Sequence, residues 1–252
     1  AWGGYRSAAS LCFLKGKIMK FIGIGLGPGD KEYITLKAVK KIKQATTVIA
    51  AASQKSGFSL ALSIAEEHIN PGTEVIKAYF PMTDEKKVTL EKYNEYIEII
   101  NQKIREKHIV AFLCIGDPLF YGTYGKLISL MRKKYPDIEI ETVAGIPAFC
   151  AAAAKSNKII AQDQDIFTVI PIHKYQNFSK QLKYSDKLLF MKVYKEKNSI
   201  IDEIKKDKSI SHILYVENSG LDTEFVSSNS KAIKQKDNNY LSLLFVDKHE
   251  NQ

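Results

Sequence analysis

The sequence is poor in the residues that build disulfide frameworks and local metal sites. It has 252 residues, with three cysteines and five histidines. Cys12, Cys114 and Cys150 form no Cys-x-x-Cys pair and no closely spaced even set, which favours a reducing cytoplasm over a secreted, disulfide-linked protein. The histidines lie far apart along the chain, so there is no local metal motif and no metal site is predicted.

Long hydrophobic runs and nucleic-acid motifs are also absent. No apolar segment approaches the roughly 20 residues that cross a bilayer, so no membrane contact is expected. The net charge is +9, from 37 Lys and Arg against 28 Asp and Glu. The sequence has no helix-turn-helix, zinc-finger or aromatic-basic signature, so nucleic acid is not the expected partner. A polycarboxylate or phosphate ligand, or a lysine-rich proteome, explains the charge at least as well.

The chain is organised around the stretch 109–123. Residues 109–115 are apolar without alternation, which predicts a parallel strand buried on both faces. Gly116, Asp117 and Pro118 then end the strand in a sharply shaped loop. Glycine permits conformations that other residues avoid, proline fixes φ, and aspartate can accept from neighbouring amides. Loops that leave the carboxyl ends of such strands bind ligands in open α/β sheets.

Strands and helices alternate through the first part of the chain. Strands are predicted at 20–26, 47–51, 74–79, 109–115 and 138–143, and helices at 35–42, 60–68, 90–107 and 125–134. This alternation predicts a parallel sheet with helices on both faces. The first 18 residues differ in sequence pattern from the segment that follows, and they are interpreted as a tag or a non-native extension.

The remainder of the chain predicts a second α/β domain with a mixed sheet. Its strands are expected at 166–170, 187–191, 213–216 and 240–246, with a helix near 199–206. We interpret the lysine-rich pattern at 183–208 as a solvated face. The predicted organisation is therefore an N-terminal α/β domain at 19–146 and a C-terminal α/β domain at 147–252.

Two more turns of small residues follow predicted strands. Residues 25–30 read GLGPGD and residues 145–149 read GIPAF. The first turn does not have the G-x-G-x-x-G spacing of a dinucleotide fingerprint, and Pro28 removes one amide, so we reject that interpretation. Small side chains at such turns allow a ligand or another backbone to approach closely.

With these two segments and residues 116–123, the sequence resembles the tetrapyrrole (corrin/porphyrin) methylase family. The three motifs occur in the family's order and at about its spacing, and the likeness runs from Met19 nearly to the C-terminus. Among the branches, the chain is most similar to enzymes that methylate carbon 20 of precorrin-2 or cobalt-factor II. That likeness rests on 117–123 (DPLFYGT), 191–193 (MKV) and 216–221 (VENSGL).

The resemblance implies an S-adenosylmethionine-dependent methyltransferase of cobalamin (vitamin B12) biosynthesis. It implies two α/β domains with the cofactor in the cleft between them, a tetrapyrrole substrate and a homodimer. The cofactor-binding residues that it implies are Leu113, Cys114, Gly116, Asp117, Pro118, Tyr121, Thr123, Ala148 and Met191. The substrate-binding floor that it implies consists of Gly27, Pro28, Gly29 and Asp30. Alignment of the reactants is expected to supply most of the acceleration, with Tyr121 as the candidate for acid–base help.

Several points depart from this interpretation or leave it open. Ala144 stands where the family usually has proline, and Gly122 stands where the branch usually has serine. Asp117 alone is also typical of a turn cap, and Cys114 of a small core residue. The alternative functions are a family methyltransferase with another target (a different corrin carbon, uroporphyrinogen, a translation factor or ribosomal RNA) and a non-catalytic tetrapyrrole or nucleotide carrier. The resemblance to the family favours cobalt-factor II over the metal-free precorrin-2 as the substrate.

Overall fold

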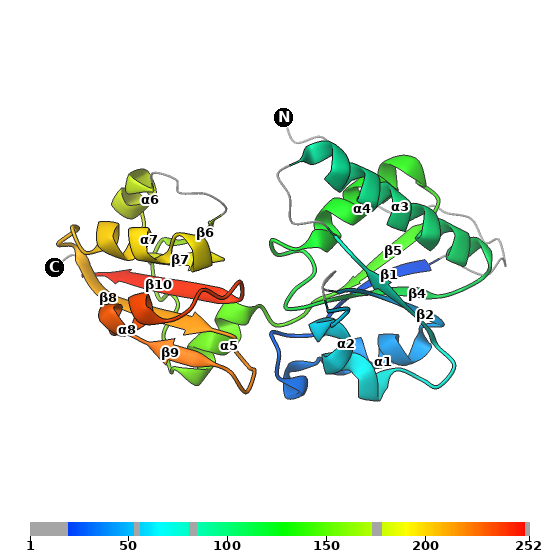
Figure 1. The fold of residues 1–252 in the computed structure, drawn as a ribbon, viewed down its shortest axis with the longest axis horizontal. Coiled ribbons are helices and arrows are strands. Elements are labelled where there is room, and N and C mark those ends of the chain that lie inside the picture. Colours follow the sequence, from blue (N-terminus) through cyan, green and yellow to red (C-terminus); the bar gives the residue numbers. More distant parts are fainter. Residues whose placement is uncertain (1–19, 53–55, 81–84, 173–177, 250–252) are drawn as a thin grey trace.

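The chain folds into two α/β units, each built on its own five-stranded sheet (Figure 1). The computed structural model describes residues 20–52, 56–80, 85–172 and 178–249, so the extension expected at 1–18 lies outside the described residues. The prediction of two α/β domains, one with a parallel and one with a mixed sheet, is confirmed. The boundary between residues 146 and 147 stays a prediction.

The first unit contains the parallel sheet, in the order β3-β2-β4-β1-β5. Its strands are β1 (Lys20–Gly25), β2 (Thr47–Ala51), β3 (Glu74–Ala78), β4 (Val110–Cys114) and β5 (Glu139–Val143). β4 pairs with both β2 and β1, and its first four residues are fully buried. This position explains why its sequence is apolar without alternation.

Helices cover both faces of this sheet (Figure 1). One face carries α1 (Leu36–Gln44) and α2 (Leu60–Ala65), and the other carries α3 (Lys86–Arg105) and α4 (Thr123–Lys134). Thr35 starts α1 because its hydroxyl oxygen accepts from the Ala38 amide at 3.1 Å. Two 3₁₀ turns, η1 (Lys31–Tyr33) and η2 (Glu66–His68), complete the unit, and η2 replaces the last turn of the helix predicted at 60–68.

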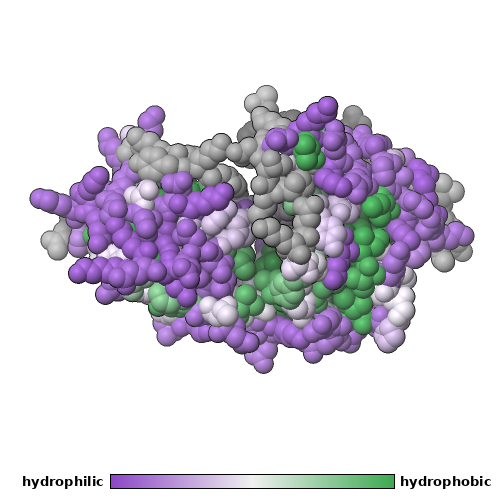
Figure 2. Space-filling view, in the orientation of Figure 1, coloured by the Kyte–Doolittle hydropathy of each residue, from purple (hydrophilic) through white to green (hydrophobic). Residues whose placement is uncertain are grey.

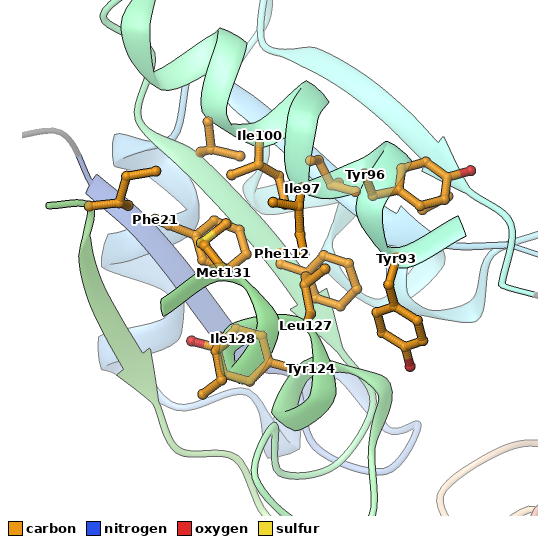
Figure 3. Packing of buried hydrophobic residues seen from close by; sticks show 14 of the residues in the cluster. Phe21, Tyr93, Tyr96, Ile97, Ile100, Phe112, Tyr124, Leu127, Ile128 and Met131 are labelled. Carbon is orange, nitrogen blue, oxygen red and sulfur yellow. The ribbon is translucent and has the colours of Figure 1, made fainter. Parts of the chain in front are cut away.

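Tyr124 packs among buried aromatic residues of the first unit (Figure 3). It fills the space that the absence of a side chain at Gly23 leaves. Its buried ring lies 5.9 Å from the Phe21 ring and 6.1 Å from the Phe112 ring, measured between centroids. A Cβ atom at position 23 would come within 2.2 Å of the Tyr124 ring. The Tyr124 hydroxyl shares a hydrogen bond of 2.9 Å with the Thr142 hydroxyl. Gly23 therefore brings α4 close to β1 and fixes where α4 begins.

The helices that follow β1 and β4 lie on opposite faces of the sheet. α1 follows β1 and packs on one face, whereas α4 follows the neighbouring β4 and packs on the other. The chain therefore continues from these two strands to opposite faces of the sheet, and their carboxyl edge is the topological switch point where open α/β sheets bind ligands.

Glu141 on the edge strand β5 gathers an ion-pair cluster. Its carboxylate lies 2.7 Å from the Lys20 ammonium and 2.8 Å from that of Lys41, and its side chain is 20% exposed. Partial burial on its own would raise the pKa of Glu141, but the hydrogen-bonded ion pairs with the two lysines outweigh it and lower the pKa to about 2. The cluster thus ties β5 to β1 and α1.

Glu141 makes the first unit sensitive to acid. Because its folded-state pKa lies below the unfolded value, its contribution is complete above about pH 4.5 and is lost as the pH falls toward 2. We expect Glu141→Gln to lower the free energy of unfolding by roughly 1–2 kcal/mol at pH 7, less than the full shift implies because the group is partly exposed. Urea unfolding between pH 7 and pH 2.5 measures this, and the difference from wild type should shrink with acid. Glu139→Gln, at a 48% exposed side chain, is the control, and an equal loss there would contradict the assignment.

The second unit contains the mixed sheet, in the order β6-β7-β10-β8-β9. Its strands are β6 (Phe167–Pro171), β7 (Lys187–Met191), β8 (Ile210–Glu217), β9 (Phe225–Ser227) and β10 (Ser242–Lys248). β6 and β7 are parallel, and the other neighbours are antiparallel. One face carries α5 (Ala148–Lys155), and the other carries α6 (Ser179–Tyr184), α7 (Lys197–Ile204) and α8 (Ser230–Gln235). A 3₁₀ turn, η3 (Val193–Lys195), connects β7 to α7.

Three short elements and one buried lysine differ from the sequence prediction. α6, β9 and α8 were not predicted, because elements of six, three and six residues are too short to show a period. The interpretation of 183–208 as a solvated face is wrong at Lys197, which is 2% exposed. Its ammonium donates to the Lys236 carbonyl and lies 5.6 Å from the Tyr215 ring centroid, and burial lowers its pKa.

The surface on the side shown in Figure 2 is mostly hydrophilic, with a hydrophobic area where the two units meet. Among the described residues, no helix is both long and apolar enough to cross a membrane.

Candidate functional site

The loops after β1 and β4 pair with each other at the carboxyl edge of the parallel sheet. The Gly116 amide donates to the Gly27 carbonyl at 2.7 Å, and the Leu26 amide donates to the Cys114 carbonyl at 2.9 Å. Gly27 and Gly116 have φ angles of +81° and +69°, which residues with a Cβ rarely adopt. The glycines of these two motifs therefore hold the loops in a paired conformation that other residues would strain.

The loop after β5 packs directly on this pair. A Cβ atom on Gly145 would lie 2.2 Å from the Gly116 carbonyl oxygen and 2.8 Å from the Gly25 backbone. A Cβ atom on Gly25 would in turn lie 2.5 Å from the Gly145 nitrogen. The three motifs that are distant in sequence thus meet, backbone against backbone, at one place.

Asp117 joins two of these loops with its carboxylate. One oxygen accepts from the Leu119 amide in its own loop at 2.9 Å, and the other accepts from the Gly145 amide at 3.1 Å. Both carboxylate oxygens therefore have backbone partners. This geometry favours a role in shaping the loops over a direct part in the chemistry.

Exposed apolar side chains stand on the loop after β4. Leu119 is 60% exposed and Tyr121 is 46% exposed. Between them in sequence, Phe120 lies 5.4 Å from the Phe149 ring on α5, centroid to centroid. The helices that begin here, α4 and α5, have no side-chain cap at their N-termini. The loop therefore combines apolar surface with two helix N-termini, where backbone amides and the helix dipole favour an anionic group.

Three further predicted cofactor residues, Leu113, Cys114 and Thr123, lie in different surroundings. Leu113 is 1% exposed and its side chain lies in the core under α1 and α2, so only its backbone faces the loops. Burial raises the pKa of the Cys114 thiol, with the charge of Asp117 as a smaller cause. Thr123 starts α4, and its side chain hydrogen-bonds to the buried Tyr93.

Ala148 and Met191 come from different elements but pack against the same apolar cluster. Ala148 starts α5 and Met191 ends β7, and both are partly buried against the face of the mixed sheet that α5 covers. The start of α5 also lies beside the loop after β4, since a Cβ on Gly116 would point toward the Ala148 amide at 3.9 Å. The structure therefore places Ala148 beside that loop, and Met191 in the same apolar cluster as Ala148.

The loop predicted as the substrate floor meets a turn of the second unit. Gly29 packs against Leu221, and Gly220, with a φ of +80°, packs against the backbone of Asp30. The turn is held by Glu224, which accepts from the Gly220 amide at 2.7 Å and pairs with Lys155 at 2.8 Å. Neither Lys155 nor Glu224 could be identified from the sequence, because neither belongs to a motif and their pairing depends on the tertiary fold.

The side chains at these loops offer little covalent chemistry. Within the described ranges, no group of three His, Cys, Asp or Glu side chains is placed to hold a metal ion. The partly buried Cys114 thiol has a raised pKa, which disfavours the nucleophilic thiolate. The arrangement suits binding and alignment of a ligand by backbone groups and apolar surface.

A comparison with protein families decides the classification. A profile of the Tetrapyrrole (Corrin/Porphyrin) Methylases matches residues 20–231. The chain belongs to this family. The resemblance seen in the three glycine motifs is thereby confirmed.

Individual relatives within the family carry different targets in their names. The chain is 30% identical to "Probable cobalt-precorrin-2 C(20)-methyltransferase" of Methanocaldococcus jannaschii, over 73% of this chain and 77% of that protein. It is 34% identical to "Probable cobalt-precorrin-7 C(5)-methyltransferase" of the same organism, over 67% and 69%. Its fold is similar to that of uroporphyrin-III C-methyl transferase from Thermus thermophilus in a structure with S-adenosyl homocysteine, at a TM-score of 0.64 and 18% identity, covering 90% and 97%.

Proposed function

We propose that this tetrapyrrole methylase transfers a methyl group from S-adenosylmethionine to carbon 20 of cobalt-factor II or precorrin-2, in cobalamin biosynthesis. The observation that carries the proposal is the meeting of the three family motifs at the switch point, where Gly25, Gly116 and Gly145 pack backbone against backbone. The carbon-20 assignment is supported by the 30% identical relative, which covers the larger share of this chain of the two named above.

The groups that lie where the two units meet fit the chemical parts of S-adenosylmethionine. The uncapped N-termini of α4 and α5 suit its carboxylate, and the half-exposed Tyr121 with the partly buried Met191 provides apolar surface for its adenosyl portion. Asp117 and Gly145 would hold the loop that receives it. When bound, the cofactor would supply an electrophilic methyl group.

The residues of this chain contribute mainly by alignment. Transfer from a sulfonium is an in-line displacement, so holding the ring carbon, the methyl carbon and the sulfur in one line supplies most of the acceleration. The ring carbon loses a proton after transfer, and Tyr121 is the candidate to receive or relay it because its ring lies exposed on the loop after β4. We place the tetrapyrrole on residues 27–30. Because this substrate is a polycarboxylate, its negative charge would also explain the excess of lysine in the chain.

A second candidate is methylation of a different corrin carbon. The specific observation in its favour is the 34% identity to a relative named for carbon 5, although that match covers less of this chain than the carbon-20 match. Both candidates use the same cofactor loops. They differ in how the tetrapyrrole lies on the floor.

An anaerobic transfer assay distinguishes these functions. Labelled S-adenosylmethionine is offered with precorrin-2 and with cobalt-factor II in parallel, and NMR locates the new methyl group. Transfer to carbon 20 is the expected result, and the preferred substrate identifies the pathway. Transfer to another carbon would favour the second candidate, and cofactor binding without transfer would favour a carrier.

The homodimer and the cytoplasmic location stay predictions. Light scattering coupled to size-exclusion chromatography tests the dimer, with a mass near twice the 28.4 kDa of one chain as the expected result.

A further inference from the structure

Lys192 lies at the seam between the two units, where both its backbone amide and its side-chain ammonium donate hydrogen bonds. It follows β7 directly, and its backbone amide donates to the Ser242 carbonyl of β10 at 2.8 Å. Its ammonium donates to the Tyr121 carbonyl in the loop after β4, at 3.1 Å. The same ammonium lies 5.5 Å from the Tyr240 ring centroid, and the Tyr194 ring packs edge-on against Tyr240. One side chain thus connects the mixed sheet to the proposed cofactor loop.

Both residues of this contact have a left-handed backbone. Lys192 has a φ of +59° and Tyr121 a φ of +50°, in a region that is strained for a residue with a Cβ. Such conformations persist only where the surroundings determine them. The Tyr121 ring is 46% exposed, so burial of the side chain does little to compensate the strain. The hydrogen bond from Lys192 is therefore an external support for the Tyr121 backbone.

If the residue at position 192 only formed a turn, its side chain would not need an ammonium group. Glycine adopts this φ without strain, and asparagine does so more readily than lysine. Lysine instead combines an unfavourable backbone conformation with a charged donor on a flexible stem, which must lose side-chain freedom to reach Tyr121. A charge-assisted hydrogen bond to a carbonyl is among the stronger polar contacts and compensates for this.

We propose that Lys192 is a positioning residue for methyl transfer, which holds the Tyr121 carbonyl and thereby fixes the loop after β4 in its ligand-binding shape. This inference rests on the proposed function, because it takes that loop as the cofactor site. It also gives the second unit a defined part in the site, since the donor directly follows β7 and the acceptor lies in the loop after β4.

The test compares Lys192→Met with Lys195→Met. Lys195 lines the same small pocket as Lys192, and its ammonium lies over the Tyr194 ring, so the control removes an equal charge from nearly the same place. Two quantities are measured: the affinity for S-adenosylhomocysteine by calorimetry, and hydrogen exchange of the segment 117–123 without ligand. We expect Lys192→Met to bind roughly tenfold more weakly and to exchange faster in that segment, with Lys195→Met near wild type.

Lys192→Gly separates positioning from stability. Glycine relieves the φ of +59°, so its free energy of unfolding should equal or exceed that of Lys192→Met, yet its affinity should fall by the same factor. Equal affinity and exchange in Lys192→Met and Lys195→Met, or retained affinity in Lys192→Gly, would overturn the inference. If wild type binds no S-adenosylhomocysteine, the proposed function fails, whereas faster exchange only in Lys192→Met still supports the contact with Tyr121.

Discussion

Gly145→Ala is expected to lower the free energy of unfolding by about 3 kcal/mol and to abolish measurable S-adenosylhomocysteine binding. The new Cβ would lie 2.2 Å from the Gly116 carbonyl oxygen and 2.8 Å from Gly25. All of these contacts are with backbone, so no side chain can rotate away. The three loops must separate, and this destroys the arrangement on which the proposed cofactor site rests.

Gly125→Ala is the matched control for that change. Gly125 lies inside α4, close in sequence to the loop after β4, and a Cβ there would meet no atom within 4 Å. Because alanine favours the helix, we expect a gain of up to about 1 kcal/mol. Urea unfolding and calorimetry measure both variants. A stable Gly145→Ala protein that still binds S-adenosylhomocysteine would refute the packing of the three motifs.

The first unit could be predicted well from the sequence because its signals are local. β4 is buried on both faces, so its apolar sequence identifies it. The glycine turns after β1 and β5 follow from the need for close backbone approach. Leu113 shows the limit of this reasoning: a motif indicates that a residue is near a site, but the alternation of the strand turns its side chain toward the core.

The contacts between the two units could not be predicted. Lys192 and Tyr121 are 71 positions apart in sequence, and neither residue type indicates a partner. Within the second unit, the Lys155–Glu224 pair depends on where α5 ends relative to the turn after β8, which the sequence does not indicate either. Periodicity describes how an element packs on its own sheet, whereas the contact between Lys192 and Tyr121 depends on how one sheet lies against the other.

Asp117→Ala is expected to weaken S-adenosylhomocysteine binding by between tenfold and a hundredfold while lowering the free energy of unfolding by only about 1–2 kcal/mol. The carboxylate accepts from the Leu119 and Gly145 amides, so its removal frees two loops at once. The amide of Leu119 is solvent-exposed and can bond to water, which limits the cost in stability. Binding suffers more because it requires one particular arrangement of both loops.

Asp207→Ala supplies the comparison for this prediction. The Asp207 carboxylate also accepts from a backbone amide two residues on, that of Ser209 at 2.9 Å, but in the turn between α7 and β8 of the second unit. We expect a similar loss of stability and an unchanged affinity. Asp117→Asn should fall between wild type and Asp117→Ala, because an amide keeps one acceptor oxygen for the two donors. If Asp117→Ala binds S-adenosylhomocysteine as tightly as Asp207→Ala does, the loop after β4 is not the cofactor site, and the site must be sought on the other side of the seam.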